Sequence, residues 1–240
     1  MLETFAALLL AHVVADFLLQ TNRMVETKQK PGTLLLHALI VLVTAQIALG
    51  RVDAWEPLIL AGLHIAIDTV KAYAMPQRLW AFLTDQGAHL VTLIAVAAVT
   101  PTLFAGGMWA GVAWLPGLML LTAGFVVATV AGGYAVALLV APWGDETALP
   151  QGLTNGGRLI GLLERGIIFL LIVAGQPAGI GFLIAAKSVL RFDTTSKDQR
   201  AGEYVIVGTL ASFGWAMAAT WATLLVAAEL PPLGIGALSP

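Results

Sequence analysis

The chain has 240 residues, of which 59% are hydrophobic and 11% are charged, and its formal net charge is −2. Soluble domains carry about 25% charged residues, so this composition excludes a soluble globular enzyme. The small negative charge excludes a nucleic-acid-binding surface. The absence of cysteine excludes disulfides, thiolate catalysis and Cys-ligated metal centres.

Apolar segments long enough to cross a membrane recur along the whole chain. They predict eight helices, at residues 2–20, 33–49, 55–75, 79–100, 117–141, 158–175, 178–192 and 203–228. The short segment 101–116 starts and ends with proline and carries two tryptophans, which is typical of an interfacial re-entrant loop. The sequence therefore predicts an all-α, polytopic transmembrane helix bundle in the lipid bilayer. Its predicted parts are a four-helix half at 1–100, a middle part at 101–157 with a cytoplasmic loop at 142–157, and a three-helix half at 158–240.

Positive charge predicts the orientation of the bundle, because cytoplasmic loops are enriched in Lys and Arg. With eight spans, Arg51 alone among the 12 Lys and Arg residues falls on the side opposite to all the others. We therefore expect both termini outside, in the periplasm if the cell is Gram-negative. The first apolar segment lacks the basic stretch and cleavage site of a signal peptide, so we expect it to remain as a helix.

The histidines indicate an internal repeat in the N-terminal half. Three polar residues recur 52 positions further along the chain: His12 as His64, Asp16 as Asp68, and His37 as His89. Each copy is predicted to form a two-helix hairpin that enters the membrane from the same side. The repeat is therefore parallel, with a pseudo-twofold axis along the membrane normal.

The ionisable residues of these hairpins are expected to lie in one layer, about 6–16 Å into the membrane from the cytoplasmic helix ends. Three His–Asp pairs are spaced four residues apart, so each pair shares one helix face. Imidazole and carboxylate ligands suit zinc first, and also manganese or non-haem iron, so we predict one or two metal ions here. The predicted ligands are His12, Asp16, His37, His64, Asp68 and His89. Asp85, four residues before His89, is predicted to be the general base or a further ligand.

Two other interpretations of these residues stay open. His–Asp pairs can hold helices together by hydrogen bonds. We favour a functional site, because burying three carboxylates and four imidazoles in one layer costs a few kcal/mol for each charged group. His–Asp pairs also suit a proton relay in a transporter. The one-sided depth of the layer argues against transport, which needs polar groups that reach both faces.

The C-terminal half carries a second polar set. In one interpretation its cations reach the membrane interface and Glu164 neutralises Lys187 or Arg165. In the other, they form an anion pocket that holds a phosphate or carboxylate group of the substrate. The predicted substrate-binding residues are Lys187, Arg191, Arg165, Glu164 and Glu203.

A family resemblance rests on the polar framework of the first half of the chain. Its motifs are His12-x-x-x-Asp16-Phe17-x-x-Gln20, His37, His64-x-x-x-Asp68 and Asp85-Gln86-x-x-His89. They resemble an uncharacterised bacterial inner-membrane family, domain-of-unknown-function family 3307. The resemblance implies an integral fold in the inner membrane and no established activity. The layout is similar to that of intramembrane zinc hydrolases such as ceramidases and adiponectin-receptor-like proteins, but the spacing differs, so no residue roles are carried over.

Three functional hypotheses follow from the sequence. The first is a membrane-embedded metal-dependent hydrolase that acts on a lipid or amphiphilic ester, amide or phosphoester at the cytoplasmic leaflet. The second is a metal-ion or proton-coupled transporter that uses the His–Asp pairs as its ion site or relay. The third is a structural or partner-binding membrane protein. Helix faces that pack within one chain and between chains look alike in lipid, so no oligomeric state is predicted.

Overall fold

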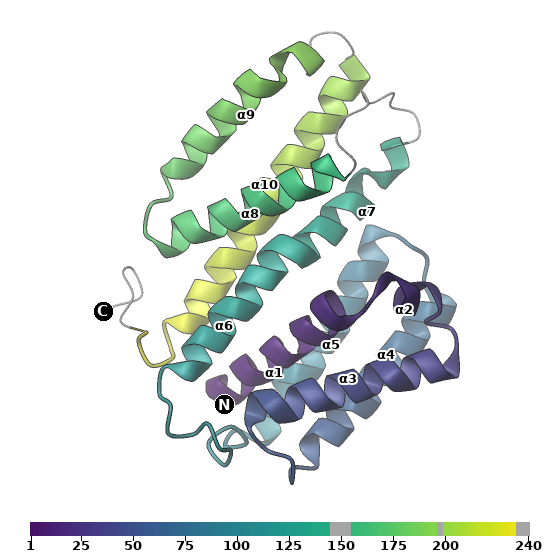
Figure 1. The fold of residues 1–240 in the computed structure, drawn as a ribbon, viewed down its shortest axis with the longest axis vertical. Coiled ribbons are helices and arrows are strands. Elements are labelled where there is room, and N and C mark those ends of the chain that lie inside the picture. Colours follow the sequence, from purple (N-terminus) through teal and green to yellow (C-terminus); the bar gives the residue numbers. More distant parts are fainter. Residues whose placement is uncertain (145–154, 196–198, 234–240) are drawn as a thin grey trace. The chain divides into compact units, whose positions relative to one another are not determined.

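The computed structural model describes residues 1–144, 155–195 and 199–233, with the side chains of residues 190–195 outside the described part. The described residues form helices and turns and contain no strand (Figure 1). The prediction of an all-α helical bundle is therefore confirmed. Most of the predicted cytoplasmic loop at 142–157 lies outside the described residues. The chain divides into two compact units, the first formed by residues 1–126 and 225–233 and the second built on residues 127–224.

The first unit contains the helices predicted for the N-terminal half. They are α1 (Leu2–Val14), the π-helix η1 (Ala15–Leu19) that continues it, α2 (Asn22–Glu26), α3 (Pro31–Leu49), α4 (Glu56–Ala74), α5 (Leu79–Val99) and α6 (Leu115–Val126). The short helix α2 was not predicted, because it carries a polar sequence between two apolar spans. The Thr21 hydroxyl caps α2 by accepting a hydrogen bond from the Met24 backbone N–H. Proline opens α3 and Gly50 ends it in the left-handed conformation, at φ 66°.

Four helices of this unit form a closed ring. Helix α1 contacts α3 and α5, and α4 contacts the same two helices. Helix α6 packs against α1 outside this ring of four. Small residues on α1, among them Ala7 and Ala11, are buried at these contacts and let neighbouring helices approach closely. The ring brings together the two predicted hairpins, α1 with α3 and α4 with α5.

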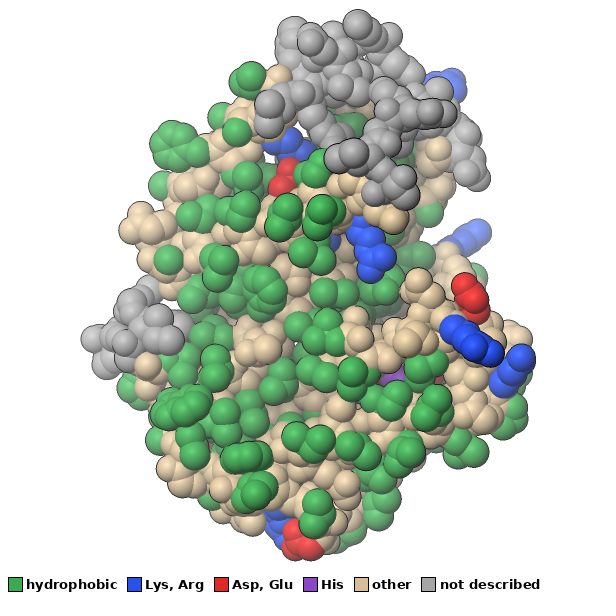
Figure 2. Space-filling model, in the orientation of Figure 1, with side chains coloured by type: hydrophobic (Ala, Val, Ile, Leu, Met, Phe, Trp, Pro, Cys, Tyr) green, Lys and Arg blue, Asp and Glu red, His purple; other side chains and the backbone are tan. Residues whose placement is uncertain are grey.

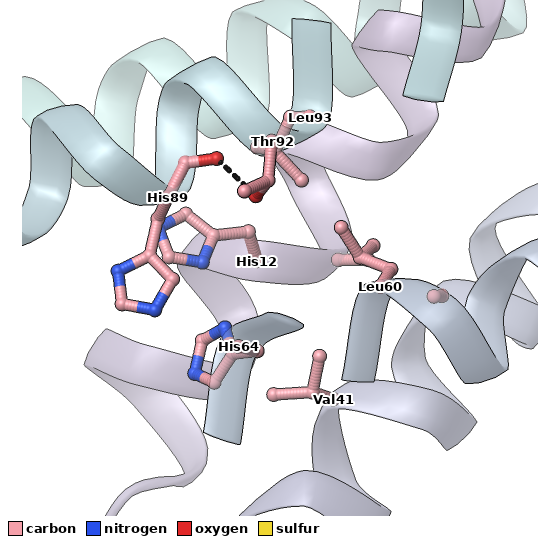
Figure 3. A pocket seen from close by; sticks show the side chains of 9 residues that line it. His12, Val41, Leu60, His64, His89, Thr92 and Leu93 are labelled. Atoms are coloured by element: carbon pink, nitrogen blue, oxygen red, sulfur yellow. Dashed lines mark hydrogen bonds between the residues drawn. The ribbon is translucent and has the colours of Figure 1, made fainter. Parts of the chain in front are cut away.

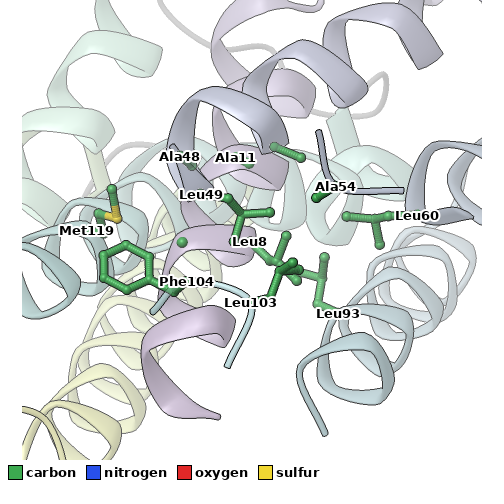
Figure 4. Close-up of a cluster of buried hydrophobic side chains, with 12 residues drawn as sticks. Leu8, Ala11, Ala48, Leu49, Ala54, Leu60, Leu93, Leu103, Phe104 and Met119 are labelled. Atoms are coloured by element: carbon green, nitrogen blue, oxygen red, sulfur yellow. The ribbon is translucent and has the colours of Figure 1, made fainter. Parts of the chain in front are cut away.

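An apolar core fills the ring (Figure 4). It includes Leu8 of α1, Leu49 of α3, Leu60 of α4 and Leu93 of α5, all buried. In sequence, Leu8, Leu60 and Leu93 each lie one helical turn from a histidine. The core therefore directly adjoins the polar residues of the ring.

The predicted interfacial segment forms turns that pack on the end of α3. Trp109 donates from its indole N–H to the Ile47 carbonyl at 2.8 Å, and the Met108 backbone N–H donates to the Gly50 carbonyl at 3.0 Å. A side chain on Gly107 would place its Cβ 2.0 Å from the Leu49 carbonyl oxygen, so this close approach requires glycine.

The second unit contains η2 (Val127–Ala131), α7 (Gly132–Gly144), α8 (Gly156–Val173), α9 (Gly179–Thr195) and most of α10 (Gln199–Ala227). Ile168 and Ile172 of α8 pack with Phe213 of α10 in its apolar core. The Trp215 indole N–H donates to the Val127 carbonyl in η2 at 2.9 Å. The continuous helical segment Leu115–Gly144 joins the fifth predicted helix to η2 and α7.

Within the part of the chain that the structure describes, six of the predicted spans form helices long and apolar enough to cross a membrane. They are Leu2–Leu19, Pro31–Leu49, Glu56–Ala74, Leu79–Val99, Leu115–Gly144 and Gln199–Ala227. The predicted spans 158–175 and 178–192 form α8 and α9 within three residues of the predicted bounds. Helix α8 carries Arg158, Glu164 and Arg165, and the apolar part of α9 covers only Gly179–Val189. Large hydrophobic side chains also cover much of the visible surface (Figure 2). These features are those of a multi-pass membrane protein.

Candidate metal centre

The ring of helices brings all seven predicted His and Asp residues of the N-terminal half together. Helix α1 and its extension η1 supply two of them, α3 one, α4 two and α5 two. They are His12, Asp16, His37, His64, Asp68, Asp85 and His89. Each of their side chains is less than 10% exposed. The predicted layer of ionisable groups is thus a single buried cluster.

Four side chains of this cluster, here called the first donor set, come close together. The Nε2 atoms of His37 and His64 lie 3.1 Å apart. Asp16 Oδ1 lies 3.2 Å from the first and 3.3 Å from the second of these nitrogens. Asp68 Oδ2 lies 3.6 Å from each. Ligands about 2.0–2.1 Å from a tetrahedral zinc ion stand about 3.3–3.4 Å apart. The five separations, from 3.1 to 3.6 Å, lie on either side of this value.

The carboxylate contacts in the first donor set do not have hydrogen-bond geometry. Among the described residues, Asp16 Oδ1 and Asp68 Oδ2 have no hydrogen-bond partner, although both lie within 3.6 Å of imidazole nitrogens. Pairs that only hold helices together would direct an N–H at each oxygen. The two Nε2 atoms are hydrogen-bonded to each other, and His37, His64 and Asp68 together offer ligand atoms close enough to hold a metal ion.

The π-helix η1 contributes to this convergence. Asp16 belongs to η1, where the wider turn shifts it away from simple stacking on His12. Asp16 Oδ1 consequently lies 3.8 Å from His12 Nδ1, the nearest imidazole nitrogen of its own helix, and closer to the rings of His37 and His64. The predicted pairing of His12 with Asp16 along one helix face is therefore weaker than the contacts that Asp16 makes across helices.

Gln86 orients His12 and Asp85. Its side-chain N–H donates to Asp85 Oδ2 at 3.1 Å, so its carbonyl oxygen faces His12 Nε2 at 3.3 Å. That carbonyl can only accept, so His12 carries its proton on Nε2 and leaves the lone pair of Nδ1 free. Nδ1 and Asp16 Oδ1 are then two acceptors beside each other, and His12, Asp16 and His64 can together hold a cation.

A further group of donors adjoins the first set. Asp68, Asp85 and His89 each offer a ligand atom within 4.8 Å of the other two. The rings of His64 and His89 lie 4.1 Å apart between centroids. Asp68 belongs to both groups, so the cluster is continuous across the ring of helices.

The structure adds Lys28, which sequence reasoning did not assign to the site. Its Nζ lies 2.6 Å from Asp68 Oδ1, and its side chain is 15% exposed. The turn that carries it is tied to α4, because Gln29 donates to the Ala72 carbonyl and the Tyr73 hydroxyl donates to the Gln29 carbonyl. The short connection between η1 and α3 is the signal that would have suggested this, since it must return close to the polar layer.

The apolar side of the cluster is closed. Figure 3 shows His12, His64 and His89 around a narrow pocket that Val41, Leu60 and Leu93 also line. The pocket has no room for a water molecule. Beyond it lies the apolar core of the ring. Along α1 with its extension η1, and along α4 and α5, a core leucine lies one helical turn from the histidine in one direction, and an aspartate lies one turn away in the other direction. The carboxylates, and Lys28 with them, therefore lie on the side of the histidines that faces away from the core.

The residues predicted to bind a substrate anion lie in the second unit. Lys187 pairs with Glu164 at 2.6 Å, and Glu203 accepts a hydrogen bond from Gln199. The buried Arg165 donates from Nε to the Thr129 carbonyl at 2.9 Å and from a terminal nitrogen to Ser212 Oγ at 3.0 Å.

The side chain of Arg191 lies outside the described residues. The contacts of Glu164, Arg165 and Lys187 join neighbouring helices, and a role for this set in substrate binding stays a prediction.

Comparison with known proteins identifies a family for the part of the chain that holds the cluster. No curated protein and no solved structure matches the chain. Residues 4–110 match the model of a family described as "Protein of unknown function (DUF3307)". The matched range contains all seven His and Asp residues of the cluster, most of α1 and the helices from α2 to α5. Over these residues, the chain resembles the DUF3307 family.

Proposed function

We propose that this protein is a membrane-embedded, metal-dependent hydrolase. The observation that carries the proposal is the first donor set, in which two imidazole nitrogens lie 3.1 Å apart and two carboxylate oxygens, neither of them hydrogen-bonded, lie 3.2–3.6 Å from these nitrogens. Zinc accepts such a mixed set of nitrogen and oxygen ligands, and manganese or iron are the other candidates. An ion bound there would act as a Lewis acid and supply a nucleophile for hydrolysis.

The other residues of the cluster support the first donor set in this proposal. His12 adds a free nitrogen lone pair next to Asp16, and Gln86 fixes its tautomer. Asp85 and His89 complete the cluster, with Asp85 as a base or a ligand. The two carboxylates of the first donor set neutralise one divalent ion, which makes its burial in a membrane bundle favourable.

The position of the cluster supports a substrate that enters from one side of the membrane. The apolar core closes the cluster on one side, and basic residues gather at the other, among them Lys28, Lys30 and Lys71. In the proposed orientation this basic side is cytoplasmic, in the inner membrane of a bacterium, with both termini outside. The substrate would be a lipid or amphiphilic ester, amide or phosphoester of the cytoplasmic leaflet.

Metal analysis tests the proposal directly. Protein purified in detergent without chelator should contain stoichiometric zinc, manganese or iron, and the His37→Ala and His64→Ala variants should lose it. Asp16→Asn should weaken binding as well.

Asp53→Asn is the matched control for Asp16→Asn. Asp53 is an exposed loop residue whose pKa is lowered because Arg51 donates hydrogen bonds to both of its carboxylate oxygens, at 3.1 and 2.6 Å. Its replacement should leave metal content unchanged. Metal content that is equal in wild type and the two histidine variants would overturn the proposal.

Activity and transport are then measured on the same preparations. Fluorogenic amphiphilic esters, amides and phosphodiesters in mixed micelles should be hydrolysed by wild type and not by His64→Ala or by chelated protein. Substrate-specific counterflow in proteoliposomes, without hydrolysis, would instead establish the transporter hypothesis.

A further inference from the structure

We propose that Asp68, Asp85 and His89 form a second divalent-cation site, so that the cluster is a dinuclear centre suited to a phosphoester. This inference rests on the proposed function, because Asp68 is shared with the first donor set. It assigns Asp85 the role of a ligand. It also narrows the substrate from esters and amides in general to anionic phosphoesters.

The donors of the second site are buried, and His89 and Asp85 each have a ligand atom without a hydrogen-bond partner among the described residues. His89 is 1% exposed, and neither of its ring nitrogens has a hydrogen-bond partner among the described residues. Asp85 Oδ1 is likewise without a partner, and it lies 4.0 Å from His89 Nδ1. Leaving such groups unsatisfied in a membrane bundle is costly, and a bound cation between them removes that cost.

The surroundings hold these donors in place. Gln86 donates to Asp85 Oδ2 at 3.1 Å, which leaves Oδ1 of the same carboxylate for an ion. The ring of His89 packs against those of His12 and His64, at centroid distances of 5.0 and 4.1 Å. Such support from neighbouring residues is what distinguishes a metal site from a chance group of polar side chains.

Lys28 competes with the second ion for the shared carboxylate. Its ammonium lies 2.6 Å from Asp68 Oδ1 and supplies the positive charge at this position. The long, flexible side chain can withdraw while Gln29 keeps the turn attached to α4. Binding of the second ion therefore displaces Lys28 from Asp68.

The charge of the loaded centre indicates the substrate. The carboxylates of Asp16, Asp68 and Asp85 carry three negative charges, which offset the charges of one divalent ion and of the Lys28 ammonium. A second divalent ion gives the centre excess positive charge in a low-dielectric environment. A phosphoester brings one or two negative charges to offset it, and paired metal ions suit the in-line displacement at phosphorus. Neutral esters and amides offer no such compensation.

Titration with Mn²⁺ tests the second site. Metal-depleted wild type should bind two Mn²⁺ ions per chain and give the EPR signal of a spin-coupled pair. His89→Ala should bind one ion and lose the coupling. Asp85→Asn, which keeps the shape of the side chain and an acceptor for Gln86, should weaken the second ion at least tenfold. Circular dichroism and gel filtration confirm that each variant is folded.

Replacing Lys28 should change the affinity for the second ion in the opposite direction to the changes at Asp85 and His89. Lys28→Met should tighten the second ion by about tenfold without changing the first, because it removes the competing charge. Lys30→Met, which replaces an exposed lysine of the same turn, is the control and should change neither ion.

The outcomes separate the two proposals. If wild type binds one ion, and this ion is lost in His37→Ala but kept in His89→Ala, the second site is overturned and the proposed function stands. No ion in wild type would overturn both. Two ions whose affinities do not respond to Asp85→Asn or His89→Ala would place the second ion elsewhere and overturn this inference.

Discussion

Replacing Lys28 by methionine removes the ammonium that lies 2.6 Å from Asp68 Oδ1 and keeps most of the apolar length of the side chain. Breaking a buried ion pair by removing one partner costs about 3–5 kcal/mol. Lys28 is 15% exposed and Asp68 is 1% exposed, so water can only partly replace the lost partner. We therefore expect the lower end of that range, about 3 kcal/mol, for the metal-free protein.

The same substitution should matter much less when metal is bound, because an ion on Asp68 then neutralises the carboxylate. For a chain of this size, 1 kcal/mol corresponds to about 2–4 °C in Tm, so the metal-free variant should melt about 6–12 °C below wild type. The assay is thermal unfolding in detergent, with chelator and with saturating Mn²⁺, and Lys30→Met is the control. An equal loss of Tm in both conditions would refute the reasoning that a metal ion and Lys28 neutralise the same carboxylate.

Three further predictions concern the packing around the cluster. Leu8→Ala should lower the free energy of unfolding by about 3–4 kcal/mol, since Leu8 is 0% exposed in the apolar core; denaturant unfolding in mixed micelles measures this, and a loss below 1 kcal/mol would contradict it. Gly107→Ala should cost about 1–3 kcal/mol in the same assay, because its Cβ would meet the Leu49 carbonyl oxygen at 2.0 Å and the turn must move; an unchanged unfolding midpoint would count against this contact. Arg165→Lys should cost about 1–3 kcal/mol, because one ammonium cannot reproduce the planar bonds to the Thr129 carbonyl and to Ser212, and metal content should stay at the wild-type value; loss of metal in this variant would show that Arg165 acts on the centre.

Much of the first unit could be predicted from the sequence. The spans 33–49, 55–75 and 79–100 agree with α3, α4 and α5 within two residues, because runs of apolar residues bounded by Pro, Gly and charged residues define membrane helices directly. The residues that form the polar cluster could also be predicted. A His or Asp inside an apolar span is costly to bury, so each one stands out in the sequence as a candidate site residue. Helices α8 and α9 also agree with the predicted 158–175 and 178–192 within three residues, although interior charges in α8 and a short apolar stretch in α9 make their hydropathy ambiguous.

The sequence by itself determined that four helices of the N-terminal half carry His and Asp at helical spacing, and therefore that a polar layer exists. Only the tertiary structure decided which of these groups meet. Asp16, which belongs to the π-helix η1, lies nearer to His37 and His64 than to His12 of its own helix. The short connection between the first two spans keeps Lys28 close to the polar layer, but only the tertiary structure shows that Lys28 contacts Asp68, since a loop lysine has no periodicity that reports its position. Spacing along one helix fixes which side chains share a face, whereas distances between helices depend on how closely the helices pack and how their axes are rotated.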